Sequence, residues 1–223
     1  MKLNGYIDHT ILKPTTLISD VEKLCKEAIQ HQFAAVCVPP PFIKTAKQFL
    51  QGSTVKTATV IGFPFGYSAI EAKIAEVVLA MIDGVDELDI VINLIALKNN
   101  DWQYLANEIS HIIPVIKQQQ KTVKIIIESG ILTNDEIIKC CQLYAPAGID
   151  FMKTSTGYAE QGATVEAVEL MRKHLSPSIQ IKASGGIKTY AFAKALIEGG
   201  ATRLGCSAGV AIVQQQDATA AGY

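Results

Sequence analysis

Residues 179–186, Ile-Gln-Ile-Lys-Ala-Ser-Gly-Gly, form a short apolar run that ends in small polar residues and two glycines. Residues 150–157, Asp-Phe-Met-Lys-Thr-Ser-Thr-Gly, have the same organisation earlier in the chain. Apolar and β-branched runs bounded by turn residues are typical of buried strands. Each stretch therefore predicts a strand that carries a lysine, Lys153 or Lys182, among apolar neighbours.

Six further runs of this kind give eight strand candidates at regular intervals along the chain. They centre near Asp8, Val36, Ala58, Asp89, Ile126, Met152, Ile181 and Leu204. The seven intervals between positions 8 and 204 average 28 residues, which accommodates a strand, an amphipathic helix and two short loops. The spacing therefore predicts strand and helix in strict alternation.

Helical periodicity fills the gaps between these candidates. Residues 20–29 place their apolar side chains on one stripe, with Ser19 or Asp20 as the N-cap, and residues 69–80 and 190–197 show similar faces. Eight such units in 223 residues predict an α/β fold, a single-domain (β/α)8 TIM barrel over residues 1–223, rather than an open doubly wound sheet. Residues 214–223 are expected to form a flexible C-terminal tail.

Composition narrows the classes of partner. The chain is 49% hydrophobic, and its 20 basic and 21 acidic residues are dispersed, so neither nucleic acid nor an anionic membrane is an expected partner. No segment reads as a signal peptide or a membrane span, which favours a cytoplasmic protein with a small-molecule partner. Five cysteines without C-x-x-C spacing and four scattered histidines predict no disulfide framework and no metal site.

A lysine in an apolar run is unusual, because desolvation disfavours its charged form. With an ordinary pKa near 10.4, only roughly 0.04% of a lysine is neutral at pH 7, whereas a pKa near 7 leaves about half of it as a free amine. A second ammonium group about 4 Å away repels it by roughly 4 kcal/mol at an effective dielectric constant near 20, enough to supply most of that change. The free amine is a nucleophile for carbonyl groups.

A barrel would bring these residues together, because catalytic side chains gather at the C-terminal ends of its strands. Lys153 and Lys182 lie on the sixth and seventh candidates and can both point inward. Asp89, in the apolar fourth run, is a candidate acid-base partner. The alternative is that each lysine and Asp89 form structural salt bridges, or that the lysines lie on a solvated face. Asp86 and Glu87 are interpreted as loop residues or helix-facing ion pairs.

Glycine and hydroxyl residues follow the last two strand candidates, as Gly-Gly-Ile-Lys at 185–188 and Gly-Cys-Ser-Ala-Gly at 205–209. Backbone N–H groups of glycine can approach a phosphate closely, and a short helix beginning at Ser207 or Ala208 would direct its positive end toward the anion. This pattern predicts a phosphate-binding site beside Lys182, although glycine also occurs in ordinary strand-to-helix turns.

Nearly the whole chain resembles the class I deoxyribose-phosphate aldolases. Seven segments carry the similarity: residues 7–14, 35–40, 60–66, 86–93, 126–130, 151–157 and 181–186. The lysine motif at 151–157 and the lysine-glycine motif at 181–186 are together highly specific for that family. The resemblance implies reversible cleavage of 2-deoxy-D-ribose 5-phosphate to D-glyceraldehyde 3-phosphate and acetaldehyde, without metal or organic cofactor, by an enzyme that is commonly a homodimer.

The same resemblance assigns residue roles. It implies that Lys153 forms the Schiff base, that Lys182 lowers the pKa of Lys153, and that Asp89 relays protons with help from water. The remaining implied positions contact the substrate or line its pocket. They are Asp8, Cys37, Thr156, Gly157, Gly185, Gly186, Lys188, Gly205 and Ser207.

Three positions depart from the family pattern or extend it. Cys206 stands where a hydroxyl residue is frequent, so one phosphate contact is expected to be altered or supplied by the backbone alone. Tyr158 stands where some relatives have lysine, so the phosphate pocket is expected to be less cationic. Tyr223 is a candidate proton shuttle, since some relatives use a terminal tyrosine on a mobile tail. Two other functions fit the same motifs: another sugar-phosphate lyase or isomerase, and a non-catalytic barrel that binds a phosphorylated metabolite.

Overall fold

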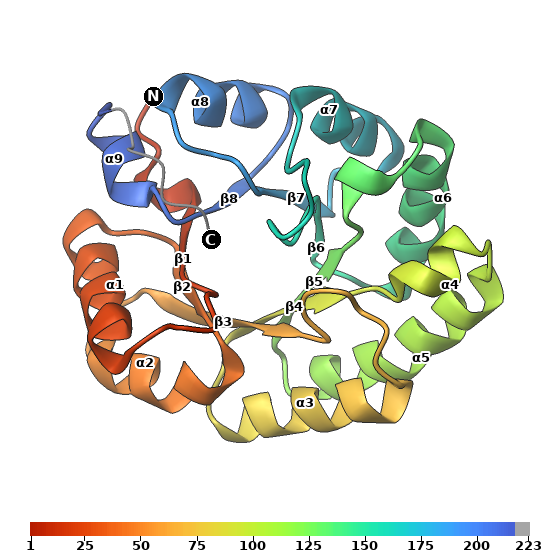
Figure 1. Ribbon diagram of the computed structural model, residues 1–223, viewed down its shortest axis with the longest axis horizontal. Coiled ribbons are helices and arrows are strands. Elements are labelled where there is room, and N and C mark those ends of the chain that lie inside the picture. Colours follow the sequence, from red (N-terminus) through yellow and green to blue (C-terminus); the bar gives the residue numbers. More distant parts are fainter. Residues whose placement is uncertain (217–223) are drawn as a thin grey trace.

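The eight expected strands all form, and they pair in chain order into a closed parallel barrel (Figure 1). The computed structural model describes residues 1–216. Every expected strand centre falls inside a strand, which confirms the predicted spacing. The strands are β1 (Ile7–Thr10), β2 (Ala35–Val38), β3 (Lys56–Ile61), β4 (Glu87–Val91), β5 (Thr122–Ile126), β6 (Phe151–Lys153), β7 (Gln180–Ser184) and β8 (Arg203–Cys206).

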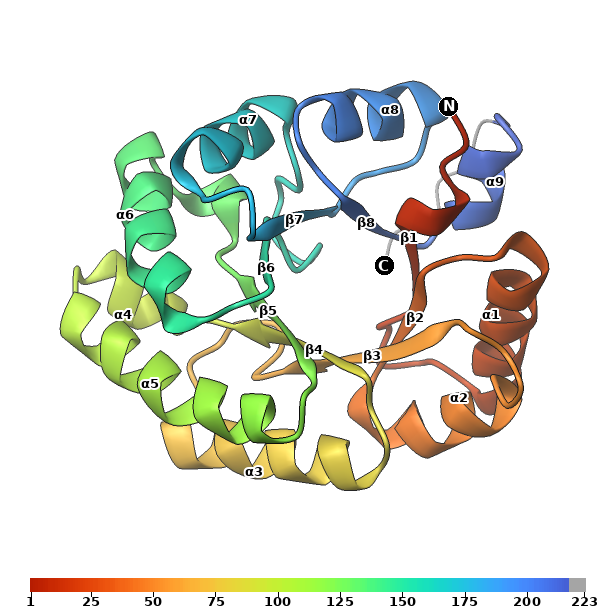
Figure 2. The ribbon, with the colours of Figure 1, turned by 180° about the vertical axis from the view of Figure 1, so that it is seen from behind.

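Helices surround the barrel on its outside, as both views show (Figures 1 and 2). Short 3-10 turns lie at Asn4–Tyr6 (η1), Pro40–Phe42 (η2), Ser129–Ile131 (η3) and Ala145–Ala147 (η4). Among the described residues, no helix is both long enough and apolar enough to cross a membrane. The helices are α1 (Ile18–His31), α2 (Ile43–Phe49), α3 (Ile70–Ile82), α4 (Leu94–Lys98), α5 (Trp102–Gln118), α6 (Asn134–Tyr144), α7 (Val165–His174), α8 (Tyr190–Glu198) and α9 (Gly209–Val213).

The helix ends follow local capping chemistry. Three threonines accept a backbone N–H as N-caps of α6, α7 and α8, and α8 ends at Glu198 with Gly199 as its C-cap. The predicted cap of α1 is wrong, because the helix begins one residue before Ser19. Asp20 is the third residue of α1, and its carboxylate accepts the N–H of Leu17 at 2.9 Å, so it still satisfies one free donor of the first turn.

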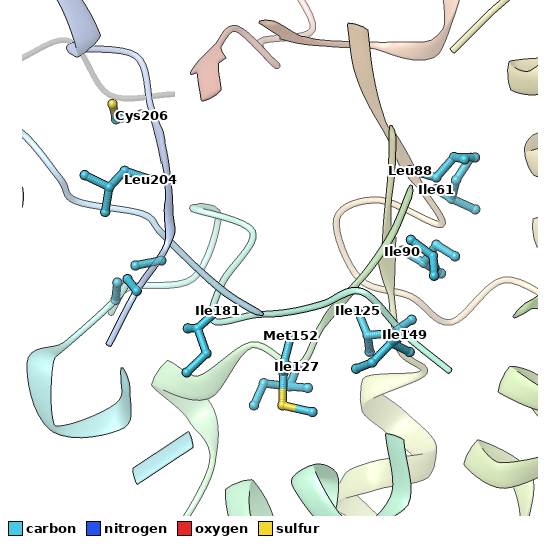
Figure 3. Packing of buried hydrophobic residues seen from close by; sticks show 14 of the residues in the cluster. Ile61, Leu88, Ile90, Ile125, Ile127, Ile149, Met152, Ile181, Leu204 and Cys206 are labelled. Atoms are coloured by element: carbon cyan, nitrogen blue, oxygen red, sulfur yellow. The ribbon is translucent and has the colours of Figure 1, made fainter. Parts of the chain in front are cut away.

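The main hydrophobic core lies between the strands and the helices. Side chains such as Ile90, Ile125, Met152 and Ile181 point outward from the barrel into this layer (Figure 3). Alternate residues point inward. Inside the barrel, Leu12, Cys37, Ala58 and Val60 form a second, smaller apolar cluster on the β1–β3 side, which leaves the β4–β8 side for polar residues.

Two aspartates connect strands and helices at the N-terminal ends of the strands. Asp86 precedes β4 and accepts the N–H of Thr57 at 2.9 Å and the ammonium group of Lys47 at 3.0 Å. Asp150 precedes β6 and in the same way accepts the N–H of Val123 at 2.8 Å and a lysine of α5 at 2.7 Å. Each aspartate ties a strand to its neighbour and to a helix. The interpretation of Asp86 as a helix-facing ion pair is confirmed.

Candidate active site

The barrel register brings the two sequence-predicted lysines together. Lys153 at the end of β6 and Lys182 in the middle of β7 are direct partners across the two strands, and both point into the barrel. Both amines donate to the same oxygen, Oδ2 of Asp89, at 2.8 and 2.7 Å, so the two nitrogens are at most about 5.5 Å apart. Their exposed fractions are 2% and 0%, which excludes a place on a solvated face.

Asp89 is the centre of this arrangement. Its Oδ2 accepts from Lys153 and Lys182, and its Oδ1 accepts from Lys124 of β5 at 2.7 Å. Burial alone would raise the pKa of the Asp89 carboxyl, but the three lysines outweigh it and hold the pKa well below its usual value. Asp89 is therefore an anion at neutral pH.

Lys182 has a second carboxylate. Its Nζ lies 2.6 Å from Oδ2 of Asp8, and Oδ1 of Asp8 accepts from Nε of Arg203 at 2.8 Å. Burial would lower the pKa of Lys182, but Asp8 and Asp89 together raise it well above its usual value. For Asp8, burial opposes ionisation, yet Arg203 and Lys182 lower its pKa to about 2. Lys182 is thus held as a cation.

Of the three lysines that contact Asp89, Lys153 has a lowered pKa, whereas Lys124 and Lys182 have raised ones. Burial has the largest effect on the pKa of Lys153 and lowers it. The negative charge of Asp89 raises this pKa, and the positive charge of Lys182 lowers it further. The expected effect of the cationic neighbour is present, but desolvation is the larger contribution. The pair thus combines a candidate nucleophile with a fixed positive charge a few ångströms away.

Three further charged residues complete the interior and were not predicted from the sequence. Glu87 is corrected: it is the first residue of β4 and points into the barrel, not into a loop or toward a helix. Its carboxylate pairs with Lys124 at 2.7 Å and with Arg203 of β8 at 2.6 Å. Lys124 lies in an apolar strand, two residues before Ile126. A lysine in an apolar run is the signal that identified Lys153 and Lys182, so Lys124 could have been predicted from the sequence as well.

Glu128 is another residue that the sequence did not indicate. It is buried just after β5, with a left-handed backbone (φ 55°) that is uncommon for a residue other than glycine. Its carboxylate accepts both the N–H and the hydroxyl of Thr156, while burial raises the pKa of the Glu128 carboxyl. The loop after β6 is therefore anchored to the loop after β5, and Thr156 lies three residues from Lys153.

Four residues of the two segments predicted to bind phosphate line one cavity of about 180 Å³, together with one glycine of the loop after β6. Gly157, Gly185, Gly186, Lys188 and Ser207 all contribute to it. Cys206 also lines this cavity, and burial raises the pKa of its thiol to about 12, so it stays neutral there. The pocket has the glycine backbone and the cationic side chain, Lys188, that suit a phosphate, and the acidic residue Glu160 also lines it.

Gly205 has a different position. It lies in β8, and a Cβ atom built on it would come within 3.0 Å of Cε of Lys182. A side chain at this point would crowd Lys182. Gly205 is not among the residues that line the cavity of about 180 Å³.

The remaining predicted residues lie around the mouth of the barrel. Cys37 belongs to the inner apolar cluster, and burial raises the pKa of its thiol. Tyr158 donates its hydroxyl to the carbonyl of Leu12 at 2.8 Å and packs edge-on against Phe63, so it joins the loops after β6, β1 and β3. Tyr223 lies outside the described residues.

Comparison with known proteins shows the same relationship along the whole chain. A family model described as DeoC/LacD family aldolase matches residues 3–215. The chain belongs to the DeoC/LacD family of aldolases. Within residues 1–216, no three histidine, cysteine, aspartate or glutamate side chains are arranged to hold a metal ion.

Individual members of this aldolase family match almost end to end. A deoxyribose-phosphate aldolase of Thermococcus gammatolerans is 50% identical, with 96% of each chain covered. One from Streptococcus gordonii is 47% identical, covering 98% of this chain and 99% of the relative. A solved deoxyribose-phosphate aldolase of Aeropyrum pernix, described as a tetramer, is 29% identical and superposes with a TM-score of 0.89 over 95% of this chain and 89% of its own.

Proposed function

We propose that this chain is a class I aldolase that reversibly cleaves 2-deoxy-D-ribose 5-phosphate into D-glyceraldehyde 3-phosphate and acetaldehyde through a Schiff base on Lys153. The observation that carries the proposal is the buried amine of Lys153, 2.8 Å from Asp89 and facing the cation of Lys182. The family of the chain and the names of its relatives support the same reaction.

The steps follow from this arrangement. The free amine of Lys153 attacks the C1 aldehyde, and loss of water gives a protonated imine, which is an electron sink. The C3 hydroxyl then loses its proton and the C2–C3 bond breaks, which releases D-glyceraldehyde 3-phosphate and leaves an enamine. Protonation of that enamine at C2 and hydrolysis release acetaldehyde and restore the amine.

Asp89 and Lys182 serve these steps in different ways. Because three lysines keep Asp89 ionised, its carboxylate is always available as an acceptor when protons are relayed through water. Lys182 keeps its proton and supplies the positive field that favours the neutral form of Lys153. Asp8 acts through Lys182, since its oxygens are paired with Lys182 and Arg203.

The substrate phosphate is assigned to the cradle beside Lys182. Gly185, Gly186, Lys188 and Ser207 line this cavity, and their backbone N–H groups, ammonium group and hydroxyl are the donors that a phosphate would use. The cavity also reaches Gly157, the residue that follows Thr156, which Glu128 anchors. We assign the sugar to the side of the interior near Thr156 and Gly157, with Cys37 in the apolar cluster on the β1–β3 side.

Reductive trapping tests the nucleophile directly. Incubation with acetaldehyde and borohydride should add one ethyl group to the intact protein, and peptide mapping should place it on Lys153. The variant Lys153→Met should give no adduct, whereas Lys194→Met, on the exposed face of α8, should be trapped normally. An adduct on Lys182 would reverse the assignment, and trapping without turnover of 2-deoxy-D-ribose 5-phosphate would favour another sugar-phosphate lyase.

A homodimer is proposed as the assembly. The solved relative from Aeropyrum pernix is described as a tetramer, so oligomers occur in this family. Light scattering coupled to size exclusion should give twice the chain mass of 24.0 kDa. A mass of one chain or of four chains would contradict the dimer. We also propose a cytoplasmic location, which fractionation of expressing cells would test.

A further inference from the structure

A second layer of charge adjoins Asp89, and the proposed steps assign no proton transfer to any of its members. Lys124 of β5 is the direct strand partner of Asp89 and has no exposed surface. Its Nζ lies 2.7 Å from Oδ1 of Asp89 and 2.7 Å from Oε2 of Glu87. Glu87 in turn pairs with Arg203, which also reaches Asp8. The layer is thus continuous with the proposed catalytic lysines.

Lys153 faces charged and titratable groups from seven elements of the barrel. Burial keeps the thiol of Cys37 protonated. The carboxylate of Glu128 accepts hydrogen bonds from Thr156 and makes no ion pair with Lys153. Asp89, Lys182, Cys37 and Glu128 act on Lys153 directly, and the others are connected to it through the ion pairs. The whole set comprises Asp8 of β1, Cys37 of β2, Glu87 and Asp89 of β4, Lys124 of β5, Glu128 after β5, Lys182 of β7 and Arg203 of β8.

Counting the ion-paired members shows an excess of positive charge. In the described chain, the connected network contains four basic groups, of Lys124, Lys153, Lys182 and Arg203, and three carboxylates. An uncompensated charge in a buried site is costly, and a lysine can remove it by losing a proton. One amine of this network is therefore favoured in its neutral form.

The contacts decide which amine that is. A guanidinium group stays protonated in proteins, which excludes Arg203. Lys124 and Lys182 each lie within 2.7 Å of two carboxylates. Among residues 1–216, Lys153 has a single carboxylate within ion-pair distance, Asp89, and shares the accepting oxygen with Lys182. Lys153 is therefore the amine that the network stabilises least as a cation.

We propose that Lys124 is a positioning residue for the Schiff-base lysine: by occupying the far oxygen of Asp89 it supplies the charge that leaves Lys153 as the amine without a proton. This inference rests on the proposed role of Lys153 as the nucleophile. Lys124 itself touches neither substrate nor reacting atoms in this account. It acts through Asp89.

The proposal predicts opposite effects for two substitutions. In Lys124→Met, Asp89 loses a competing cation, so the proton on Lys153 is held more tightly and imine formation requires a higher pH. In Glu87→Gln, one carboxylate charge is lost, so Lys153 should release its proton at a lower pH. In the double variant, as in the unsubstituted protein, the basic groups outnumber the carboxylates by one. The pH at which Lys153 loses its proton should therefore return toward that of the unsubstituted protein.

The experiment measures the rate of reductive trapping by acetaldehyde and cyanoborohydride against pH, read from intact mass. For Lys124→Met, the acid limb of this profile should move up by about one to two pH units, which slows trapping about 10- to 100-fold below the limb. Glu87→Gln should move the limb down, and the double variant should lie between the two. The control Lys117→Met removes a partly exposed lysine that pairs with Asp150 at the opposite end of the barrel, and it should leave the limb in place.

Each outcome is decisive. If the unsubstituted protein is trapped at Lys153 but the limbs of Lys124→Met and Glu87→Gln coincide with its own, this inference is overturned while the proposed function stands. Shifts of the same sign in both variants would also overturn it. If the unsubstituted protein forms no adduct at all, the proposed function itself fails. Should Lys124→Met not fold, Glu87→Gln decides alone: a downward shift supports the inference and an unmoved limb overturns it.

Discussion

Substituting Lys182 by methionine removes the positive charge that Lys153 meets across Oδ2 of Asp89. The two nitrogens are at most about 5.5 Å apart, because each lies less than 3 Å from the same oxygen. At that separation and an effective dielectric constant near 20, two cations repel by about 3 kcal/mol, which corresponds to about two pH units in the pKa of Lys153. The substitution removes this repulsion, so the pKa of Lys153 should rise.

The assay is imine formation, separated from turnover. The rate of trapping by acetaldehyde and cyanoborohydride is followed by intact mass between pH 5.5 and 10, and its acid limb reports loss of the proton from Lys153. For Lys182→Met the limb should move up by about two pH units, so that trapping at neutral pH slows about 100-fold. Because trapping does not require the later proton transfers, a loss confined to turnover would point to a proton-relay role instead.

A matched control is Lys194→Met, which removes an exposed lysine that pairs with Glu198 on α8. Its limb should coincide with that of the unsubstituted protein. The reasoning is refuted if Lys182→Met is folded, still forms the adduct on Lys153 and shows the same limb as the control.

Three further predictions concern the support of the site. Gly205→Ala would place a Cβ 3.0 Å from Cε of Lys182, so kcat/KM should fall about tenfold while the thermal midpoint changes little; full activity would show that Lys182 has room to move. Lys73→Ala would leave Glu108 buried without its partner at 2.6 Å, so the free energy of unfolding in urea should fall by about 3–5 kcal/mol. A fall below about 1 kcal/mol would contradict a buried ion pair that stabilises the fold. The pKa of Asp8 falls from 3.8 to about 2 on folding, so ionised Asp8 stabilises the folded protein by roughly 2 kcal/mol above pH 4, and this stabilisation is lost between about pH 4 and pH 2. In urea unfolding at each pH, Asp8→Asn should lack this part of the fall in the free energy of unfolding. If the free energies of both proteins fall in parallel with pH, the prediction is contradicted.

The strand positions and the pairing of the two lysines could be predicted because both depend on local patterns. Apolar runs closed by glycine mark the strands, and a regular interval of 28 residues leaves little choice of fold. Once β6 and β7 are neighbours, alternation of side chains brings Lys153 and Lys182 together at the same level. The start of α1 was less accurate, since Asp20 satisfies the helix end from its third position.

The deeper charged layer could not be derived with the same certainty. Glu87 is the first residue of its strand, where the sequence gives no clear sign of which side faces the interior. Its pairing with Arg203 connects β4 and β8, which are not neighbours and meet only because the barrel closes. Glu128 depends on a left-handed backbone that no local pattern indicated. These contacts are consequences of closure and loop geometry.

The most direct test of the account is the pKa of Lys153 in the folded protein. Nitrogen-15 NMR of the lysine side chains, with Lys153→Met to assign the resonance, would follow its protonation against pH. Lys153 should titrate with a midpoint clearly below the usual value of 10.5, while Lys182 stays protonated throughout the same range. A midpoint at or above 10.5 for Lys153, or loss of the proton from Lys182 first, would contradict this expectation.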